Sequence, residues 1–213
     1  EIIMEQGLKL VLINVNGLNI PTKRRRMLSK IEKQKMDVVC LQEVHIKKQD
    51  ESLLQYKKLG KLYTTLAEEK ESGRIILIVE LFVGRKSILL VGIYAPNKNQ
   101  SEFYKNTHDK IIELGNQNVC VIGDYNTIVD IQKDYTSEQK CKFKRNILPK
   151  AFFEMSEELN LMDLWRTLNP GVTQFTFYSN PHKSWSRIDM QLEDKKAIKP
   201  QAQMAYQENS TKI

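Results

Sequence analysis

One apolar run that ends in polar residues constrains the fold of this chain more than any other stretch. Residues 119–122 are all apolar, and three of the four are β-branched, so they predict a buried strand. Gly123 breaks the run, because glycine permits turns that other residues resist, and Asp124 and Asn126 follow it. If strand geometry continues past the glycine, these two side chains point to the same side.

Three further apolar runs end in the same way. Residues 8–13 lead into Asn14 and Asn16, residues 37–41 lead into Gln42 and Glu43, and residues 88–93 lead into Tyr94, Pro96 and Asn97. Every strand ends where polar residues begin, so a single end carries little information. Four ends that deliver acids, amides and a phenol favour an active site held by a rigid apolar scaffold.

Length and charge set the class of protein and of partner. The 213 residues fit one domain, 1–213, and a hydrophobic content of 41% is enough for a core. The chain has 33 Lys and Arg against 26 Asp and Glu, a net charge of +7. Such a balance favours polyanionic partners, either nucleic acid or an anionic membrane surface.

The cysteines and the apolar runs indicate a cellular compartment. Cys40, Cys120 and Cys141 show no CxxC spacing, so we expect neither a disulfide framework nor a zinc site, and a reducing environment. Residues 1–5 lack the layout of a signal peptide, and no apolar run approaches the roughly 18 residues of a membrane span. We therefore expect an intracellular protein, nuclear or cytoplasmic, with no membrane partner.

Further strands and helices follow from periodicity. Helices are expected from Lys23, capped by Thr22, and over residues 102–114 and 151–160; strands are expected over 62–66, 74–83, 87–94, 175–178 and 185–190. Residues 84–86 join two of these strands in a hairpin. Hairpins of this kind argue against a regular doubly wound sheet and favour a two-layer sheet sandwich with helices outside.

The helix from Lys23 has a strongly basic surface. Six of its residues are cations: Lys23, Arg24, Arg25, Arg26, Lys30 and Lys33. They form either a solvated face or a patch that contacts phosphates beside the site. We favour the solvated face for most of them and expect Arg24 and Arg25 to contact DNA.

The polar residues at the strand ends suit metal-assisted hydrolysis of a phosphodiester. Glu43 offers the hard oxygen that Mg²⁺ or Mn²⁺ prefers, and Asn14 could hold the same ion or a phosphate oxygen. Asp124 could orient or deprotonate a water, and Asn126 could position Asp124 or the scissile phosphate. Tyr94 could donate a hydrogen bond to a phosphate oxygen.

Seven stretches that include these residues resemble, in their order along the chain, the motifs of the endonuclease/exonuclease/phosphatase superfamily. The resemblance is strongest to the apurinic-type endonuclease domain of LINE retrotransposon reverse transcriptases of the mammalian LINE-one type. Each motif is weak alone, but the ordered set is specific and extends over nearly the whole chain. The matching stretches are residues 14–19, 41–45, 93–97, 123–126, 161–170, 175–179 and 186–189.

The resemblance implies a fold, an activity and a set of roles. The fold would be a DNase I-like four-layer α/β sandwich, with two packed mixed sheets flanked by helices. The activity would be nicking of DNA with Mg²⁺ or Mn²⁺ by a monomer without a small-molecule cofactor, normally fused to an RNA-directed DNA polymerase. The implied roles are metal ligation by Glu43 and Asn14, contact with the scissile phosphate by Tyr94, Asp124 and Asn126, orientation of a catalytic histidine by Asp189, and proximity to DNA for Asn97, Thr176 and Ser186.

The sequence departs from the family at its end. The family finishes with a Ser-Asp-His triplet, which this chain lacks; Glu208 and Asn209 stand nearest to it, and an amide cannot carry a proton as imidazole does. His45, His108 and His182 do not match that position. A positioned acid–base group contributes roughly 10²–10⁴-fold, so we expect impaired chemistry.

Two other departures concern the sheet. A strand pair between residues 73 and 93 is expected to be shortened and the last strand to be missing, as in a truncated or degenerate copy.

Two alternative functions stay open. One is a catalytically inactive module that binds nucleic acid or another partner, and the other is a different phosphodiesterase of the same superfamily.

Overall fold

A computed structural model describes residues 9–56, 58–64, 75–83, 86–115, 118–138 and 146–196. They group into two compact units, one up to residue 64 and one from residue 75, and each is described by itself. The single-domain boundaries 1–213 stay a prediction. Across the described residues we find no helix with the length and apolar character that a membrane crossing requires.

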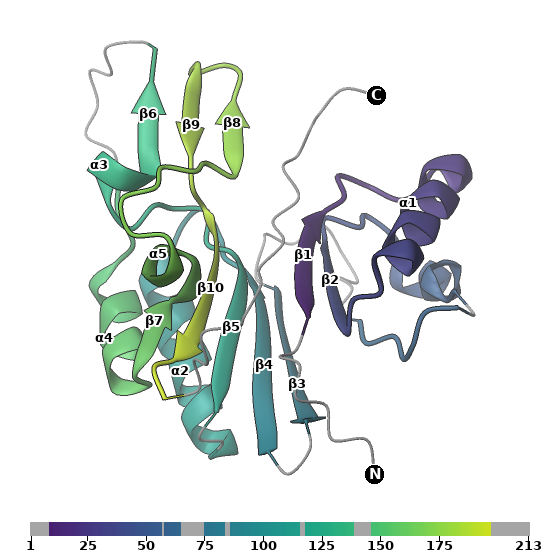
Figure 1. The fold of residues 1–213 in the computed structure, drawn as a ribbon, viewed down its shortest axis with the longest axis horizontal. Helices are drawn as coiled ribbons and strands as arrows, with labels where there is room; N and C mark the ends of the chain where they lie inside the picture. Colours follow the sequence, from purple (N-terminus) through teal and green to yellow (C-terminus); the bar gives the residue numbers. More distant parts are fainter. Residues whose placement is uncertain are drawn as a thin grey trace. The chain divides into compact units, whose positions relative to one another are not determined.

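The first unit is a parallel strand pair with a crossover helix (Figure 1). Strand β1 (Leu10–Asn14) pairs in parallel with β2 (Val38–Gln42), and α1 (Pro21–Gln34) connects them; a 3₁₀ helix, η1 (Lys48–Leu54), follows. Both predicted strands are confirmed. Their inner face packs against α1 in a core of Val11, Ile13, Val15, Leu18, Leu28, Ile31, Ile46 and Leu54.

Two expectations for this unit are wrong. Helix α1 begins at Pro21 after Ile20, so Thr22 lies inside the helix and does not cap it. Proline is well suited to the first helical turn, because its φ is already helical and its missing N–H needs no partner there. The strand expected over residues 62–66 is absent from residues 61–64, where exposed Tyr63 packs under the Lys61 ammonium instead. Residues 65 and 66 lie outside the described residues.

The second unit contains a mixed five-stranded sheet in the order β3-β4-β5-β10-β7. Strands β3 (Ile75–Val83) and β4 (Lys86–Tyr94) form the predicted hairpin, and β4 runs parallel to β5 (Val119–Asp124). Strand β10 (Asp189–Asp194) is antiparallel to both β5 and β7 (Leu161–Asp163). The strand expected to be missing at the end of the chain, and residues 208 and 209, lie outside the described residues.

A smaller sheet stands beside these strands, in the order β6-β9-β8. It contains β6 (Tyr135–Ser137), β8 (Phe177–Ser179) and β9 (Ser184–Ser186). The single strand expected over residues 185–190 is therefore wrong: β9 ends at Ser186, β10 begins at Asp189, and they belong to different sheets. The chain leaves the small sheet at Arg187, whose side chain is held by buried ion pairs.

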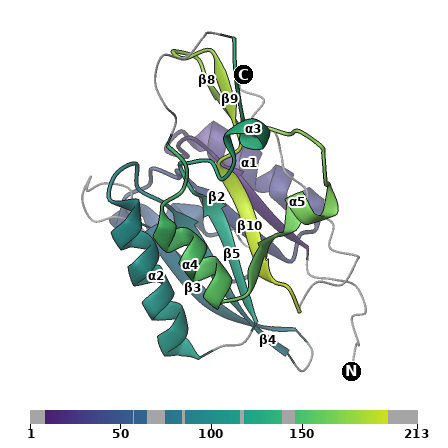
Figure 2. The same cartoon turned by 90° about the vertical axis from the view of Figure 1, so that its left-hand side faces the viewer.

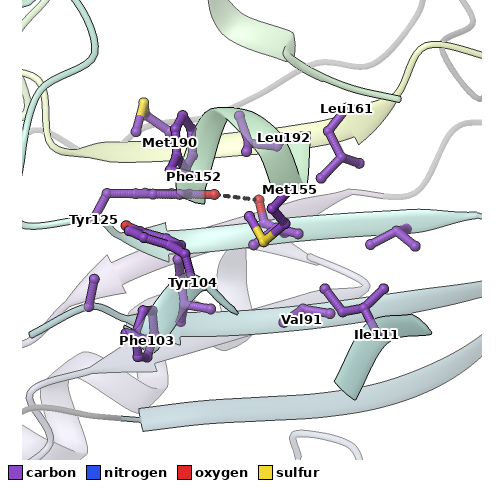
Figure 3. Close-up of a cluster of buried hydrophobic side chains, with 14 of the residues drawn as sticks. Val91, Phe103, Tyr104, Ile111, Tyr125, Phe152, Met155, Leu161, Met190 and Leu192 are labelled. Atoms are coloured by element: carbon purple, nitrogen blue, oxygen red, sulfur yellow. Dashed lines mark hydrogen bonds between the residues drawn. The ribbon is translucent and has the colours of Figure 1, made fainter. Parts of the chain in front are cut away.

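Helices α2 (Gln100–Leu114) and α4 (Lys150–Glu158) lie across one face of the five-stranded sheet, as Figure 2 shows. Both were predicted, with starts one or two residues later. Their inner sides join alternate residues of β4, β5 and β10 in a core centred on Tyr104, Tyr125 and Phe152 (Figure 3). The ring centroids of these three lie 5.3–6.3 Å apart. The remaining helices, α3 (Ile131–Asp134) and α5 (Leu164–Leu168), are short.

The cysteines that the structure describes are free thiols within strands. Cys120 is buried in β5, and Cys40 is half-buried in β2. Burial raises the pKa of the Cys40 thiol to about 11, so it stays protonated and unreactive at neutral pH.

The face of the sheet opposite the helices contains two polar residues of β10. Gln191 pairs with Ile122 and Glu193 with Cys120, so both polar side chains lie beside apolar neighbours on β5. The Gln191 side-chain amide donates a hydrogen bond to the Glu193 carboxylate. Burial raises the pKa of Glu193 above its ordinary value, and this hydrogen bond only partly opposes the effect. The fold therefore favours the protonated carboxyl.

Replacing Glu193 with glutamine is expected to raise the free energy of unfolding at pH 7 by about 1 kcal/mol, the low end of the cost of burying an incompletely paired polar group. Because the folded-state pKa is raised, the contribution of Glu193 to stability is most favourable at low pH and is lost as pH rises through that pKa. Urea unfolding at about pH 4 and pH 7 checks this prediction. The free energies of unfolding of the wild type and Glu193→Gln should be equal at the lower pH and differ at the higher pH. Equal stability at both values would refute it.

Candidate active site

The three inner strands of the five-stranded sheet place Tyr94, Asp124 and Asp189 in one row, where β4 and β5 end and β10 begins. Tyr94 on β4 is the register partner of Asp124 on β5, and Asp189 on β10 is the antiparallel partner of the same residue. Laterally paired residues point to the same face, with Cβ atoms about 5 Å apart. Asp124 is 5% exposed, and the other two are half-buried. Three residues that are far apart in the chain are thus neighbours in the sheet.

Asn126 joins this row through hydrogen bonds rather than strand geometry. Its backbone N–H donates to Asp124 Oδ1 at 2.7 Å, and its side-chain Nδ2 donates to the Ala95 carbonyl at 2.5 Å. The expectation that the strand continues past Gly123 to Asn126 is wrong: β5 ends at Asp124, and Asn126 has a left-handed φ of 52°. Asparagine tolerates this region better than most residues, so the turn folds back onto the carboxylate.

Tyr125 and Gln100 hold this turn from the inside. Tyr125 is fully buried, its backbone N–H donates to the Ile188 carbonyl at 2.8 Å, and its phenol donates to the Val121 carbonyl at 3.3 Å. Gln100 Nε2 donates to both the Pro96 and Tyr125 carbonyls at 2.9 Å. One buried amide therefore fixes the loops after β4 and β5 together. No sequence motif marks Gln100, and sequence reasoning missed it.

Gly123 allows β4 and β5 to approach each other at the row. A Cβ atom at this position would lie 1.8 Å from the Ile93 carbonyl oxygen, closer than any real contact. Any other residue would force β4 away from β5 and would separate Tyr94 from Asp124. The glycine that the sequence marks as a strand breaker is therefore required for the spacing of the site.

A buried ionic network supports the start of β10. Arg187 is 3% exposed; its Nε donates to Asp134 Oδ1 at 2.8 Å and its NH2 to Asp163 Oδ2 at 2.5 Å. Arg166 NH2 donates to the same Asp134 oxygen at 2.6 Å. Burial by itself raises the pKa of Asp134, but the hydrogen bond and charge of Arg187, with hydrogen bonds from the Asp130 backbone and Arg166, together hold that pKa below its ordinary value. Sequence reasoning missed this network.

The residues expected near DNA in this unit have different environments. Thr176 Oγ1 accepts hydrogen bonds from the backbone N–H groups of Ile188 and Asp189, both at 3.1 Å, so it fixes the first residue of β10. Ser186 is buried in β9 at 9% exposure. Asn97 is exposed in the loop after β4. Of these three, only Asn97 offers a fully exposed side chain.

Asn14 and Glu43 lie at the ends of two paired strands of the first unit. Asn14 ends β1 and pairs with Gln42, and Glu43 follows directly after β2. Three residues here have left-handed φ angles, 43° at Asn16, 53° at Glu43 and 55° at His45. Such strained backbone persists where the surroundings impose it, and it is concentrated at functional sites. The ends of both parallel strands therefore combine polar residues with backbone in the left-handed region.

The two arginines expected to contact DNA differ in this unit. Arg24 NH1 donates to the Leu18 carbonyl at 2.8 Å and to the Asn19 carbonyl at 3.2 Å, so its guanidinium shapes the loop before α1. Arg25 is exposed on the helix surface.

The donor chemistry of these residues suits Mg²⁺. No group of three or more His, Cys, Asp or Glu that could hold a metal occurs among the described residues. Mg²⁺ needs no such cage, because it binds through one or two carboxylates and completes its shell with water and substrate oxygens. Glu43 with Asn14, and Asp124 with Asp189, offer carboxylate and amide oxygens of this kind.

The sequence has a relative among transposon proteins. No protein-family model matches it. The Transposon TX1 uncharacterized 149 kDa protein of Xenopus laevis is 22% identical over 209 residues. The match covers 86% of this chain and 16% of that protein, so the chain spans a small part of its relative's length.

Solved structures share the fold over most of their length. The 3'-5' exonuclease NExo of Neisseria meningitidis matches with a TM-score of 0.64 at 16% identity, covering 88% of this chain and 87% of that one. A 3' phosphatase NExo from Neisseria bound to a product DNA hairpin gives 0.59 at 14% identity, with 89% and 88% covered. The endonuclease domain of TRAS1, a telomere-specific non-LTR retrotransposon, gives 0.58 at 12% identity, with 89% and 86% covered. The chain therefore shares the α/β fold of these nuclease and phosphatase structures.

Proposed function

We propose that this chain is a metal-dependent DNA endonuclease domain of a LINE-type retrotransposon protein. One observation carries the proposal: Tyr94, Asp124 and Asp189 stand in register on three adjacent strands, and Asn126 is hydrogen-bonded to Asp124. The fold, the transposon relative and the TRAS1 endonuclease domain support it. DNA as substrate is supported by the Neisseria structure with its DNA hairpin and by the net charge of +7.

In this proposal each residue has a defined part in hydrolysis of a phosphodiester. Asp124 is buried and takes a proton from the attacking water, while the Asn126 N–H fixes the orientation of its carboxylate. The Tyr94 phenol donates a hydrogen bond to a phosphate oxygen and so stabilises the charge that develops there. Glu43 and Asn14 would hold Mg²⁺ or Mn²⁺, which when bound supplies positive charge to the phosphate.

The same proposal includes a reduced rate for the 213-residue chain, because its sequence contains no Ser-Asp-His triplet whose histidine Asp189 could orient. His108 Nε2 lies 3.6 Å from Glu158 Oε2, in a pair that joins α2 and α4. His45 and His182 are exposed. None of the three is held against Asp189 by a contact that the structure describes. Loss of an acid–base group costs roughly 10²–10⁴-fold, so turnover should be slow but dependent on metal.

Nicking of supercoiled plasmid by the 213-residue chain tests the function. We expect slow conversion to the relaxed form with Mg²⁺, none with chelator, and a loss of roughly 100-fold or more in Glu43→Ala. Glu51→Ala, which removes a second half-buried carboxylate of the first unit, is the matched control and should leave nicking unchanged. Salt-sensitive DNA binding without nicking would instead support an inactive binding module. Cleavage of a lipid or inositol phosphodiester, with intact plasmid, would support a different phosphodiesterase.

A further inference from the structure

The positive charge of the chain is concentrated in its first unit. Residues 9–64 contain 13 Lys and Arg against 5 Asp and Glu, whereas the rest of the chain contains 20 against 21. Residues 9–64, the described part of this unit, therefore carry the excess of positive charge, and nearly half of their cations are on α1.

The structure separates the cations of α1 into two sets. Lys23 Nζ donates to the Asn16 carbonyl at 2.8 Å and Arg24 donates to the Leu18 carbonyl, so these two side chains are used by the fold. The second set is exposed and has no ion pair or hydrogen bond with any residue that the structure describes: Arg25, Arg26, Lys30 and Lys33.

Three members of the second set form a stripe along the helix. Arg26, Lys30 and Lys33 are spaced four and three residues apart, so they lie on one side of α1, away from buried Leu28 and Ile31. The stripe extends about 10 Å at a rise of 1.5 Å per residue. One DNA strand carries a phosphate about every 3.4 Å of helix axis, so the stripe matches about three consecutive phosphates.

Nothing acidic on the helix neutralises this stripe. Glu32 is the one acid in the sequence of α1, and it binds Lys58 Nζ at 3.1 Å and accepts from the Tyr56 hydroxyl at 3.4 Å. Lys33 stands in the last turn, where a cation favours the helix dipole, but like charges at spacings of three and four residues repel each other. Helix stability therefore does not account for the whole stripe.

We propose that the Arg26, Lys30 and Lys33 stripe is a docking surface for the sugar–phosphate backbone of double-stranded DNA. The choice of DNA as the polyanion rests on the proposed function; the surface itself uses neither Glu43 nor Asp124 and needs no cleavage. Contacts of this kind are made to phosphates, so binding through the stripe is independent of sequence. The stripe thus holds DNA on a part of the protein that takes no part in the chemistry.

The test is equilibrium binding of a fluorescent 20-base-pair duplex, about two helical turns, to the full chain in chelator across a salt series. The triple variant Arg26→Gln, Lys30→Gln, Lys33→Gln should reduce the slope of log affinity against log salt by about 2.7, or about 0.9 for each lost phosphate contact. Affinity at about 0.1 M salt should fall roughly 10- to 100-fold. The control variant Lys86→Gln, Lys105→Gln, Lys110→Gln removes the same charge from exposed positions of the second unit and should leave the slope unchanged.

Equal slope changes in both triple variants would overturn the proposal, because net charge alone would then explain binding. Tight binding to phosphatidylserine vesicles without binding to the duplex would overturn the assignment of DNA. If circular dichroism shows the triple variant unfolded, the single variant Lys30→Gln should still reduce the slope by about 0.9. If the chain does not nick plasmid but the triple variant still reduces the salt slope, the proposed enzyme is refuted and this inference stands.

Discussion

Replacing Arg187 with methionine is expected to lower the free energy of unfolding by about 3–5 kcal/mol, because it leaves buried carboxylates without their main partner. Asp134 is 1% exposed and would keep Arg166 as its one cationic partner, together with the hydrogen bond from the Asp130 backbone N–H. Asp163 would lose its bond to Arg187 NH2. Methionine has a similar length, so the loss measures the ionic contacts rather than a cavity. Urea unfolding of both proteins measures the change.

The dependence of stability on pH distinguishes the loss of the Arg187 ion pairs from a nonspecific loss of packing. The folded-state pKa of Asp134 is lowered below 3.8, so its ionic contribution is full at neutral pH and is lost as pH falls through that pKa. The difference in free energy of unfolding between the wild type and Arg187→Met should therefore become smaller in strong acid. Lys150→Met breaks an exposed pair with Glu154, 2.6 Å long, and should leave the urea midpoint unchanged. A gap that does not depend on pH, or a loss equal to that control, would contradict the role of Arg187.

Replacing Asp124 with asparagine is expected to slow plasmid nicking roughly 10²–10⁴-fold while the fold is retained. The amide oxygen can still accept the hydrogen bond from the Asn126 N–H, so the turn keeps its shape while the group that accepts a proton is lost. Nicking rates with Mg²⁺, together with urea unfolding, measure both effects. Asp109→Asn makes the same change at an exposed position of α2 and should alter neither. Unchanged nicking in Asp124→Asn would remove this residue from the mechanism.

The strand ends could be predicted because a local pattern determines them. A β-branched apolar run followed by Gly123 and Asp124 needs burial, and a sheet that buries such runs side by side brings Tyr94, Asp124 and Asp189 into one row. The same reasoning found Asn14 and Glu43 at the ends of parallel strands. The pattern of one segment was enough for Tyr94, Asp124, Asn14 and Glu43, whereas Asp189 was expected from the family resemblance, since the strand predicted over 185–190 is wrong.

The supports of the site could not be predicted, because they depend on contacts between distant segments. Gln100 is an ordinary polar residue at the start of a helix until the loops after β4 and β5 meet at its amide. Arg187 lies within the strand that periodicity predicts over 185–190, yet 53 residues separate it from Asp134, and the bond between them redirects the chain. Tertiary contacts therefore override the local preference for extended structure there.

Nicking rates of the double variant Glu43→Ala, Asp124→Asn test most directly whether both residues act in one metal-dependent reaction. Residues that serve the same step show losses that do not multiply, so the account predicts a double variant within about threefold of the slower single variant. All three variants should approach the rate of the wild type in chelator. Nicking that is equally fast with chelator, or single losses that multiply fully in the double variant, would contradict the account.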